Sequence, residues 1–366
     1  MTASTNALTP HPSPGTRPVR PVRRIGLAAV LALLLVAPAC SEGSTTENGD
    51  AAPSTTVAAA QPDPVPEVVG ADTFNVGSVT ETEVDDTRVT KAFNGYPELP
   101  QRTMPVTVYY PAEGEATKEV VDGAPPATDD GPFPLLVFSH GVNSAPLAYL
   151  LTLRAIASAG YVVVAATSPL GSNKTPGGGG IQDMDQQALD VGFLIDRSLA
   201  ASAGDEGPLA GMLDPDRVGT FGHSMGAVAT MGAGLQECCL DDRIDAVAEW
   251  SGILVPLGGG PGEVAEEAKD RPVLIVHGDS DGTVPYVHGQ NVYSQASGPK
   301  YLVTLVGEPH TPPFIVGLDS PAGSVATQAT IDFFDRYLKD DPEGIDRLEA
   351  TVAAAPGKAT LQADEQ

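Results

Sequence analysis

Cysteine is scarce in this chain, and the motifs that usually build metal sites are absent. Three cysteines occur among the 366 residues, at positions 40, 238 and 239. Neither a C-x-x-C pair nor an H-E-x-x-H motif is present, and two adjacent cysteines cannot complete the ligand set of a typical zinc site. We therefore expect no bound metal. Cys238 and Cys239 could form a vicinal disulfide, or one of them could be a free buried thiol.

Positive charge is scarce as well. Lys and Arg number 20 against 47 Asp and Glu, which gives a formal net charge of −27. Proteins that bind nucleic acid neutralise its phosphates with clustered basic side chains, so this balance excludes nucleic acid as a partner. The same charge disfavours docking on an anionic lipid surface through a basic patch. Any attachment to a membrane must therefore come from another source.

The most hydrophobic run of the sequence is too short for a typical membrane-spanning helix. Residues 25–36 form an apolar stretch of twelve residues, whereas a spanning helix needs about 20. Four arginines precede this stretch within residues 17–24, and the small residues 37–39 follow it. A charged region, an apolar region and a small-residue cleavage site in this order predict an export signal peptide over residues 1–39.

The residue that follows the predicted cleavage site is Cys40. Small residues leading directly into this cysteine resemble a bacterial lipobox, after which the cysteine carries lipid. Plain cleavage after Ala39 is the alternative, and it would leave a soluble secreted protein. Residues 40–72 are rich in Ser, Thr, Ala, Pro and acids, so they cannot bury a core. We expect them to form a disordered tether behind the lipidated cysteine.

The most informative motif surrounds Ser224. A β-rich run at residues 218–221 leads into G-x-S-x-G at residues 222–226, and an alanine- and glycine-rich run compatible with a helix continues to residue 235. A strand, this turn and a helix in succession are typical of a nucleophile elbow, which lifts a serine hydroxyl above the edge of a sheet. The flanking glycines fit because so tight a turn leaves little room for side chains. Ser224 is the candidate nucleophile.

A serine nucleophile needs a histidine to take its proton and a carboxylate to orient that histidine. His310 is the candidate base, since it follows the last predicted strand at residues 301–306. Asp281 is the preferred acid because it lies in the loop after a predicted strand at residues 273–276, and open α/β sheets place their chemistry at such strand ends. Glu249, which ends an apolar run one strand earlier, is the alternative acid, and Asp279 is a third candidate.

Acyl transfer also requires N–H donors for the oxyanion of its transition state. The Met225 N–H, directly after the nucleophile, is the first candidate. The Val142 N–H is the second, because it lies in the loop after a predicted strand at residues 134–139 and Gly141 allows a close approach there. We expect the neighbouring His140 to be a structural support.

Four features resemble the α/β-hydrolase superfamily: F-S-H-G at 138–141, G-H-S-M-G at 222–226, H-G-D-S-D-G-T-V-P at 277–285, and the late histidine at 310. The resemblance is to the dienelactone-hydrolase-like and platelet-activating-factor-acetylhydrolase-like branch, and more remotely to cutinase-like polyester hydrolases. It covers roughly residues 76–348. Dienelactone hydrolases proper use a cysteine nucleophile, which this chain lacks, so their activity is not implied.

The resemblance implies roles for individual residues. Ser224, His310 and Asp281 correspond to the catalytic triad, with Val142 and Met225 as oxyanion donors. The acetylhydrolases place their triad acid at the end of the earlier strand, so the resemblance also keeps Glu249 as an alternative. In the polyester hydrolases a tryptophan after that strand lines the substrate cleft, and Trp250, the only tryptophan here, stands at that place.

The expected fold is α/β, an α/β-hydrolase domain over residues 73–350. We expect a mostly parallel sheet of about eight strands with helices on both faces and a small or absent lid. Two strands near residues 74–89 and 104–110 are expected to pair antiparallel at the edge of this sheet. Residues 351–366 are expected to form a flexible C-terminal tail.

The predicted function is that of an extracytoplasmic serine hydrolase that cleaves a small-molecule or lipid-like carboxylic ester. It is expected to need no cofactor and to act as a monomer. Lipidated Cys40 would attach it to the cell membrane, or the enzyme would be secreted in soluble form. A lipase or polyester-type hydrolase with an open cleft is one alternative, and a non-catalytic binding lipoprotein on a hydrolase scaffold is another.

Overall fold

The computed structural model describes residues 73–315 and 317–365. The predicted signal peptide, Cys40 and the tether lie outside these residues. In the part of the chain that is described, no helix combines the length and the apolar character needed to cross a membrane. The same residues contain no group of three or more His, Cys, Asp or Glu side chains placed to hold a metal ion.

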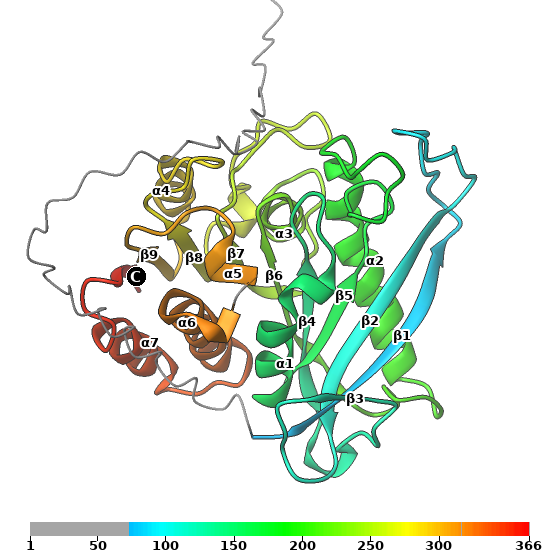
Figure 1. Cartoon of the computed structure of the whole chain (residues 1–366), viewed down its shortest axis with the longest axis horizontal. Helices are drawn as coiled ribbons and strands as arrows, with labels where there is room; N and C mark the ends of the chain where they lie inside the picture. Colours follow the sequence, from blue (N-terminus) through cyan, green and yellow to red (C-terminus); the bar gives the residue numbers. More distant parts are fainter. Residues whose placement is uncertain (1–72, 316, 366) are drawn as a thin grey trace, which may run out of the picture. The chain divides into compact units, whose positions relative to one another are not determined.

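A ten-stranded sheet forms the centre of the domain, with the strand order β10-β9-β8-β7-β6-β4-β5-β2-β1-β3 (Figure 1). The interior strands run parallel to one another, and both of their faces are covered. Buried parallel strands consist of nearly continuous apolar residues, and the interior strands show this pattern apart from the polar start of β6. These strands are β4 (Phe133–Ser139), β5 (Val162–Ala166), β6 (Leu213–His223), β7 (Ile244–Trp250), β8 (Val273–Gly278) and β9 (Lys300–Leu305).

One edge of the sheet is antiparallel, as predicted. β1 (Asn75–Asp85) pairs antiparallel with β2 (Arg102–Ala112), and β2 pairs antiparallel with β5. A short strand, β3 (Val120–Asp122), lies outside β1 and is parallel to it.

The other edge of the sheet corrects the prediction of a flexible tail over residues 351–366. Helix α7 (Gly344–Ala353) reaches into this segment, and β10 (Ala359–Asp364) then pairs antiparallel with β9. The unpaired N–H and C=O groups along the edge of β9 are satisfied by this pairing, while Ala359 is buried and Leu361 packs against the core. The sheet has ten strands. The prediction of about eight strands did not include β3 and β10.

Helices cover both faces of the sheet (Figure 1). Strand side chains alternate between the two faces, so that Leu136 and Phe138 belong to one core cluster while Leu135 and Val137 belong to the other. The first cluster includes residues of α1 (Leu150–Ser158), α6 (Pro321–Leu338) and α7, and the second includes residues of α2 (Met184–Ser202), α3 (Met225–Leu235) and α4 (Val287–Gln295).

Short helical turns complete the described part of the chain. They are η1 (Thr128–Asp130), η2 (Pro146–Tyr149), η3 (Glu266–Ala268), α5 (Pro312–Ile315) and η4 (Gly317–Asp319). Between β7 and β8 only η3 occurs, which agrees with the expectation of a small or absent lid. Cys238 and Cys239, between α3 and β7, are joined as a vicinal disulfide.

The strand order contains a topological switch next to β4. The chain passes from β4 to β5 on one side, and it then crosses to β6 on the other side of β4. Open α/β sheets bind their ligands in the crevice beyond the carboxyl ends of the strands at such a point. The loop after β4 and the turn after β6 meet here, and they carry Gly141 and Ser224.

Candidate active site

Ser224 occupies a strained turn between β6 and α3. Its backbone angles are φ 58° and ψ −119°, a conformation that non-glycine residues adopt rarely and that often marks functional sites. A Cβ atom at Gly226 would collide with the Ser139 carbonyl, and one at Gly222 would lie 2.6 Å from the Gly226 carbonyl carbon. The glycines on either side of the serine are therefore required by close backbone approach, as the sequence motif indicates.

The structure brings three of the predicted side chains into one hydrogen-bonded chain. His310 Nε2 lies 2.8 Å from Ser224 Oγ, and His310 Nδ1 lies 2.6 Å from Asp281 Oδ2. Since an ionised carboxylate can only accept, Nδ1 carries the proton and Nε2 accepts from the serine hydroxyl. Each of the three residues is at most 9% exposed, so little water competes for these bonds.

Asp281 lies in the loop between β8 and α4, where several donors surround its carboxylate. Its Oδ1 atom accepts from the Thr283 and Val284 N–H groups, each at 2.8 Å. Burial by itself raises the pKa of Asp281, but hydrogen bonds from His277, His310 and Val284 lower it by more, so the net pKa is well below the usual range. The carboxylate is therefore ionised, and it can stabilise a positive charge on His310.

Glu249, the alternative acid, is bonded elsewhere. It is completely buried in β7, and its Oε2 atom accepts from the Gly252 N–H at 2.6 Å. Burial raises the pKa of Glu249 to about 7, although the charge of His277 and the Gly252 N–H lower it in part. Within the described residues the carboxylate bonded to His310 is that of Asp281.

Trp250 does not line a cleft, and the expectation drawn from the polyester hydrolases is wrong. Its side chain is 1% exposed. The indole ring stacks on Phe314 at a centroid distance of 5.4 Å, and its Nε1 atom donates to Thr330 Oγ1 at 3.1 Å. Trp250 is a core residue because it points to the sheet face that α6 covers.

The two candidate oxyanion donors lie beside the serine. Met225 is the first residue of α3, and the first N–H groups of a helix have no partner within that helix. Val142 follows Gly141, where an added Cβ would lie 3.4 Å from Ser224 Cβ. The loop after β4 therefore passes directly against the nucleophile.

Sequence reasoning missed two buried groups behind this loop, Tyr149 and His223. The Gly141 N–H donates to Tyr149 Oη at 3.2 Å, and Tyr149 Oη lies 2.8 Å from His223 Nδ1. His223 Nε2 lies 2.9 Å from the carbonyl oxygen of His310. In the sequence, His223 could have been singled out by its position directly before the nucleophile. No local pattern marks Tyr149.

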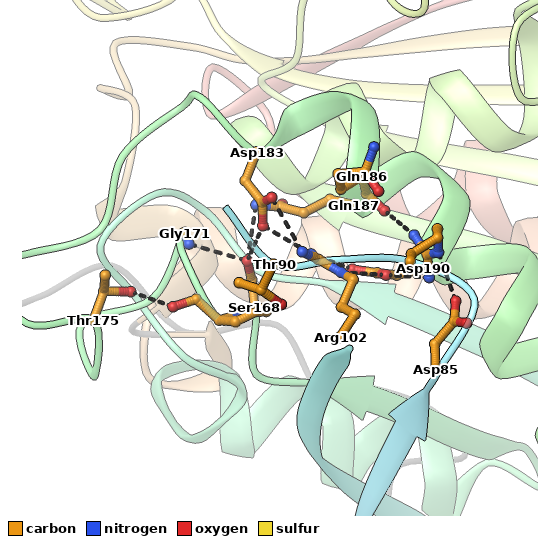
Figure 2. Close-up of polar contacts among 12 residues, drawn as sticks. Asp85, Thr90, Arg102, Ser168, Gly171, Thr175, Asp183, Gln186, Gln187 and Asp190 are labelled. Carbon is orange, nitrogen blue, oxygen red and sulfur yellow. Dashed lines mark hydrogen bonds and ion pairs between the residues drawn. The ribbon is translucent and has the colours of Figure 1, made fainter. Parts of the chain in front are cut away.

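An ion cluster that the sequence did not indicate holds the start of α2 (Figure 2). Arg102 is fully buried and donates to both carboxylate oxygens of Asp190, at 2.6 and 2.7 Å, and of Asp183, at 2.8 and 3.1 Å. Gln187, one turn into the same helix, donates to Ser168 Oγ at 3.0 Å. The cluster therefore supports the loop at residues 167–180, which borders the loop after β4.

Residues 93–168 match the family model described as platelet-activating factor acetylhydrolase, isoform II. Among curated proteins, the chain is 24% identical over 179 residues to the uncharacterized protein YfhR of Escherichia coli strain K12. It is 26% identical over 160 residues to the protein of the same name from E. coli O157:H7. These alignments cover 44% and 39% of this chain, and 55% and 50% of the relatives. The chain thus spans about half the length of the curated relatives it matches.

Among solved structures, the chain is similar to a ferulic acid esterase from Streptomyces cinnamoneus. The TM-score is 0.60 and the sequence identity is 22%, over 83% of this chain and 98% of the esterase. At this identity the likeness concerns the fold. The protein is therefore an α/β-hydrolase in its fold, and over residues 93–168 it resembles the platelet-activating factor acetylhydrolases.

Proposed function

We propose that this protein is an extracytoplasmic serine hydrolase that cleaves carboxylic esters through an acyl-enzyme intermediate. The observation that carries the proposal is the hydrogen-bonded chain from Ser224 through His310 to Asp281, with distances of 2.8 and 2.6 Å. The three hydrogen-bonded side chains lie at the topological switch point of the sheet, beside two candidate N–H donors. The likeness to an esterase fold supports the same chemistry.

In the first half of the reaction, His310 Nε2 takes the proton of the Ser224 hydroxyl while Oγ attacks the ester carbonyl. Asp281 remains ionised and stabilises the imidazolium that forms. The Met225 and Val142 N–H groups hold the negative oxygen, and the loss of one such donor typically lowers kcat by about 10²–10³. His310 then gives its proton to the departing alcohol, which leaves an acyl group on Ser224.

In the second half, His310 takes a proton from water, and the hydroxide attacks the acyl group against the same two donors. Collapse of this intermediate releases the carboxylic acid and returns the proton from His310 to Ser224. Besides the ester and one water molecule, the two halves use side chains and backbone groups of this protein.

Hydrolysis of p-nitrophenyl esters of increasing acyl length by the full chain in mild detergent tests the proposal. We expect turnover that Ser224→Ala abolishes and that Ser294→Ala, an exposed serine on α4, leaves unchanged. Short-chain preference would favour a small-ester substrate, and rates that rise with chain length would favour the lipase alternative. An equal rate in the Ser224→Ala variant would contradict the mechanism, and a lack of turnover in every case would favour the non-catalytic alternative.

We also propose that the enzyme is exported and anchored to the membrane by lipid on Cys40. The support is the sequence pattern of residues 17–40, which lies outside the described residues. Partitioning into Triton X-114 detergent tests the proposal. The native protein should enter the detergent phase, whereas the Cys40→Ser variant should stay in the aqueous phase or remain unprocessed. Native protein in the aqueous phase would favour a soluble secreted enzyme.

A further inference from the structure

The peptide group between Gly141 and Val142 has a dedicated hydrogen-bond partner. His140 Nδ1 lies 2.8 Å from the carbonyl oxygen of Gly141. That carbonyl belongs to the same peptide group as the Val142 N–H, which is the second candidate oxyanion donor. A side chain that fixes this carbonyl therefore also fixes the direction of the N–H.

The protonation of His140 follows from its partners. Its Nε2 atom lies 3.1 Å from the Ser168 nitrogen, and a backbone N–H can only donate, so Nε2 has no proton. The neutral ring then carries its single proton on Nδ1, which donates to the Gly141 carbonyl. Burial lowers the pKa of His140 to about 4, although the bond to Gly141 opposes this in part. The ring is therefore neutral near pH 7.

Peptide geometry converts this bond into an orientation of the donor. A trans peptide group is planar, and its C=O and N–H bonds point in opposite directions. With the carbonyl directed at His140, the Val142 N–H points away from that ring. Among the residues that the structure describes, no protein group accepts a hydrogen bond from the Val142 N–H. This N–H can therefore donate to an oxygen of the substrate.

The peptide groups on either side have other partners. The Gly141 N–H donates to Tyr149 Oη at 3.2 Å, and the Asn143 N–H donates to the Gly171 carbonyl at 2.7 Å. In the described part of the chain, only His140 contacts the Gly141 carbonyl by a hydrogen bond. The orientation of the central peptide group thus depends on this one side chain.

The far side of the His140 ring is also fixed. Ser168 Oγ accepts from Gln187 Nε2 and from the Gly171 N–H, each at 3.0 Å (Figure 2). These bonds hold Ser168, whose N–H is the partner of His140 Nε2. The histidine ring is thereby held between the strand-end loop and the start of α2.

We propose that His140 is a positioning residue of the oxyanion hole, which aims the Val142 N–H at the substrate by donating to the Gly141 carbonyl. The proposal rests on the ester hydrolase function given above. Within the described residues, the His140 ring has hydrogen bonds to Gly141 and Ser168 and none to Ser224 or His310.

Two amide substitutions separate the two bonds of the ring. In His140→Asn, the amide nitrogen stands near the place of Nδ1, so the donor to Gly141 is kept and the acceptor for Ser168 is lost. In His140→Gln, the amide reaches toward the place of Nε2, so the bond to Ser168 is kept and the donor to Gly141 is lost. Each variant keeps one buried polar contact and should fold. His288→Asn, on the surface helix α4, is the control.

We expect His140→Gln to lower kcat about 10- to 100-fold, which is less than the loss of a whole oxyanion donor because the N–H is misdirected and not removed. The KM should change less than about twofold, because the bond acts in the transition state. His140→Asn should lower kcat clearly less than His140→Gln does, because it keeps the donor to Gly141, and His288→Asn should stay close to the native enzyme. Equal losses in the Asn and Gln variants would show a merely structural role and would overturn the proposal.

A thiono ester gives a readout that structural damage would not change. Sulfur accepts hydrogen bonds weakly, so an ester whose carbonyl oxygen is replaced by sulfur gains little from the oxyanion hole. The ratio of the oxygen-ester rate to the thiono-ester rate should therefore fall in His140→Gln and stay constant in His288→Asn. A constant ratio in His140→Gln, with both rates lowered equally, would overturn the proposal.

Crystal structures of the two variants decide the point without any assay of activity. The Gly141–Val142 peptide group should keep its orientation in His140→Asn and change it, or adopt two orientations, in His140→Gln. An unchanged peptide group in His140→Gln overturns the proposal whether or not esters are hydrolysed. A changed peptide group with unchanged hydrolysis also overturns it, while the Ser224→Ala comparison judges the proposed function separately.

Discussion

Replacing Arg102 by Met should reveal how strongly the ion cluster of Figure 2 supports the fold. Methionine can fill much of the space of the buried arginine stem, so the main loss is the cation shared by Asp183 and Asp190. Asp190 keeps Arg88 at 2.8 Å. Within the described residues, the carboxylate of Asp183 would keep one hydrogen bond, from the Ser168 hydroxyl at 3.5 Å. It would therefore be left as an uncompensated buried charge.

The expected cost at neutral pH is about 3–5 kcal/mol of unfolding free energy, which is typical when one partner of a buried ion pair is removed. The cost should depend on pH. Burial raises the pKa of Asp183 even with Arg102 opposing it, and loss of Arg102 should raise it further. A carboxyl group with a raised folded-state pKa favours folding below its unfolded pKa and loses this contribution as pH rises through the folded value.

Urea unfolding of the native protein and the Arg102→Met variant between pH 5 and pH 8 measures this effect. The difference in unfolding free energy should be largest at pH 8 and should shrink toward pH 5. Adding Asp183→Asn should recover part of the loss, because the amide carries no charge. Arg197→Met is the matched control, since Arg197 is 56% exposed in its pair with Glu83, and such pairs contribute about 0–1 kcal/mol. A loss that is below 1 kcal/mol, or equal at every pH, would refute the reasoning.

Three further outcomes are expected. Asp281→Asn should lower kcat for p-nitrophenyl esters by about 10⁴, as loss of a triad acid does. The Glu249→Gln variant should hydrolyse the same esters at the native rate, and the reverse result would make Glu249 the triad acid. Because Trp250 is buried, its fluorescence should resist quenching by acrylamide in the native state, and strong quenching would contradict its place in the core. Truncation after residue 357 should expose the edge of β9, lower the Tm and promote aggregation seen by light scattering; an unchanged Tm would show that β10 contributes little.

The parts of the site that the sequence could predict depend on local backbone geometry. The turn at Ser224 requires glycine at both flanking positions, so the nucleophile has a short and specific pattern. His310 and Asp281 could be placed because each follows a buried strand, and the carboxyl ends of parallel strands lie along one edge. The continuous apolar character of β4, β7 and β8 likewise indicated strands covered on both faces.

The parts that could not be predicted depend on contacts between distant residues. Trp250 follows Glu249 on the same strand, so the two side chains point to opposite faces. The packing of helices from elsewhere in the chain covers both side chains, and the sequence of the strand does not show this. Arg102 is charged and would ordinarily be placed in solvent. Its burial depends on carboxylates 81 and 88 residues further along the chain. β10 has little apolar character, and its pairing depends on the free edge of β9.

The hydrogen bonds behind the site form a directed chain that fixes the two loops relative to each other. The Gly141 N–H can only donate and the His310 carbonyl can only accept, so Tyr149 must donate to His223 Nδ1 and His223 Nε2–H must donate to His310. Burial and, to a smaller extent, the charge of the neighbouring His310 together lower the pKa of His223 to about 3. His223 is therefore neutral near pH 7, as this chain requires.

Tyr149→Phe would break this chain at its centre while keeping the ring, which packs on Phe138 at 4.9 Å. The Gly141 N–H and His223 Nδ1 would both lose a buried partner, at a cost of about 1–3 kcal/mol each. We expect a lower unfolding free energy in urea together with a lower kcat, because the loops that carry the oxyanion donor and the base would no longer share a fixed link. Unchanged stability and unchanged kcat would mean that each loop is held in place independently, by its own strand.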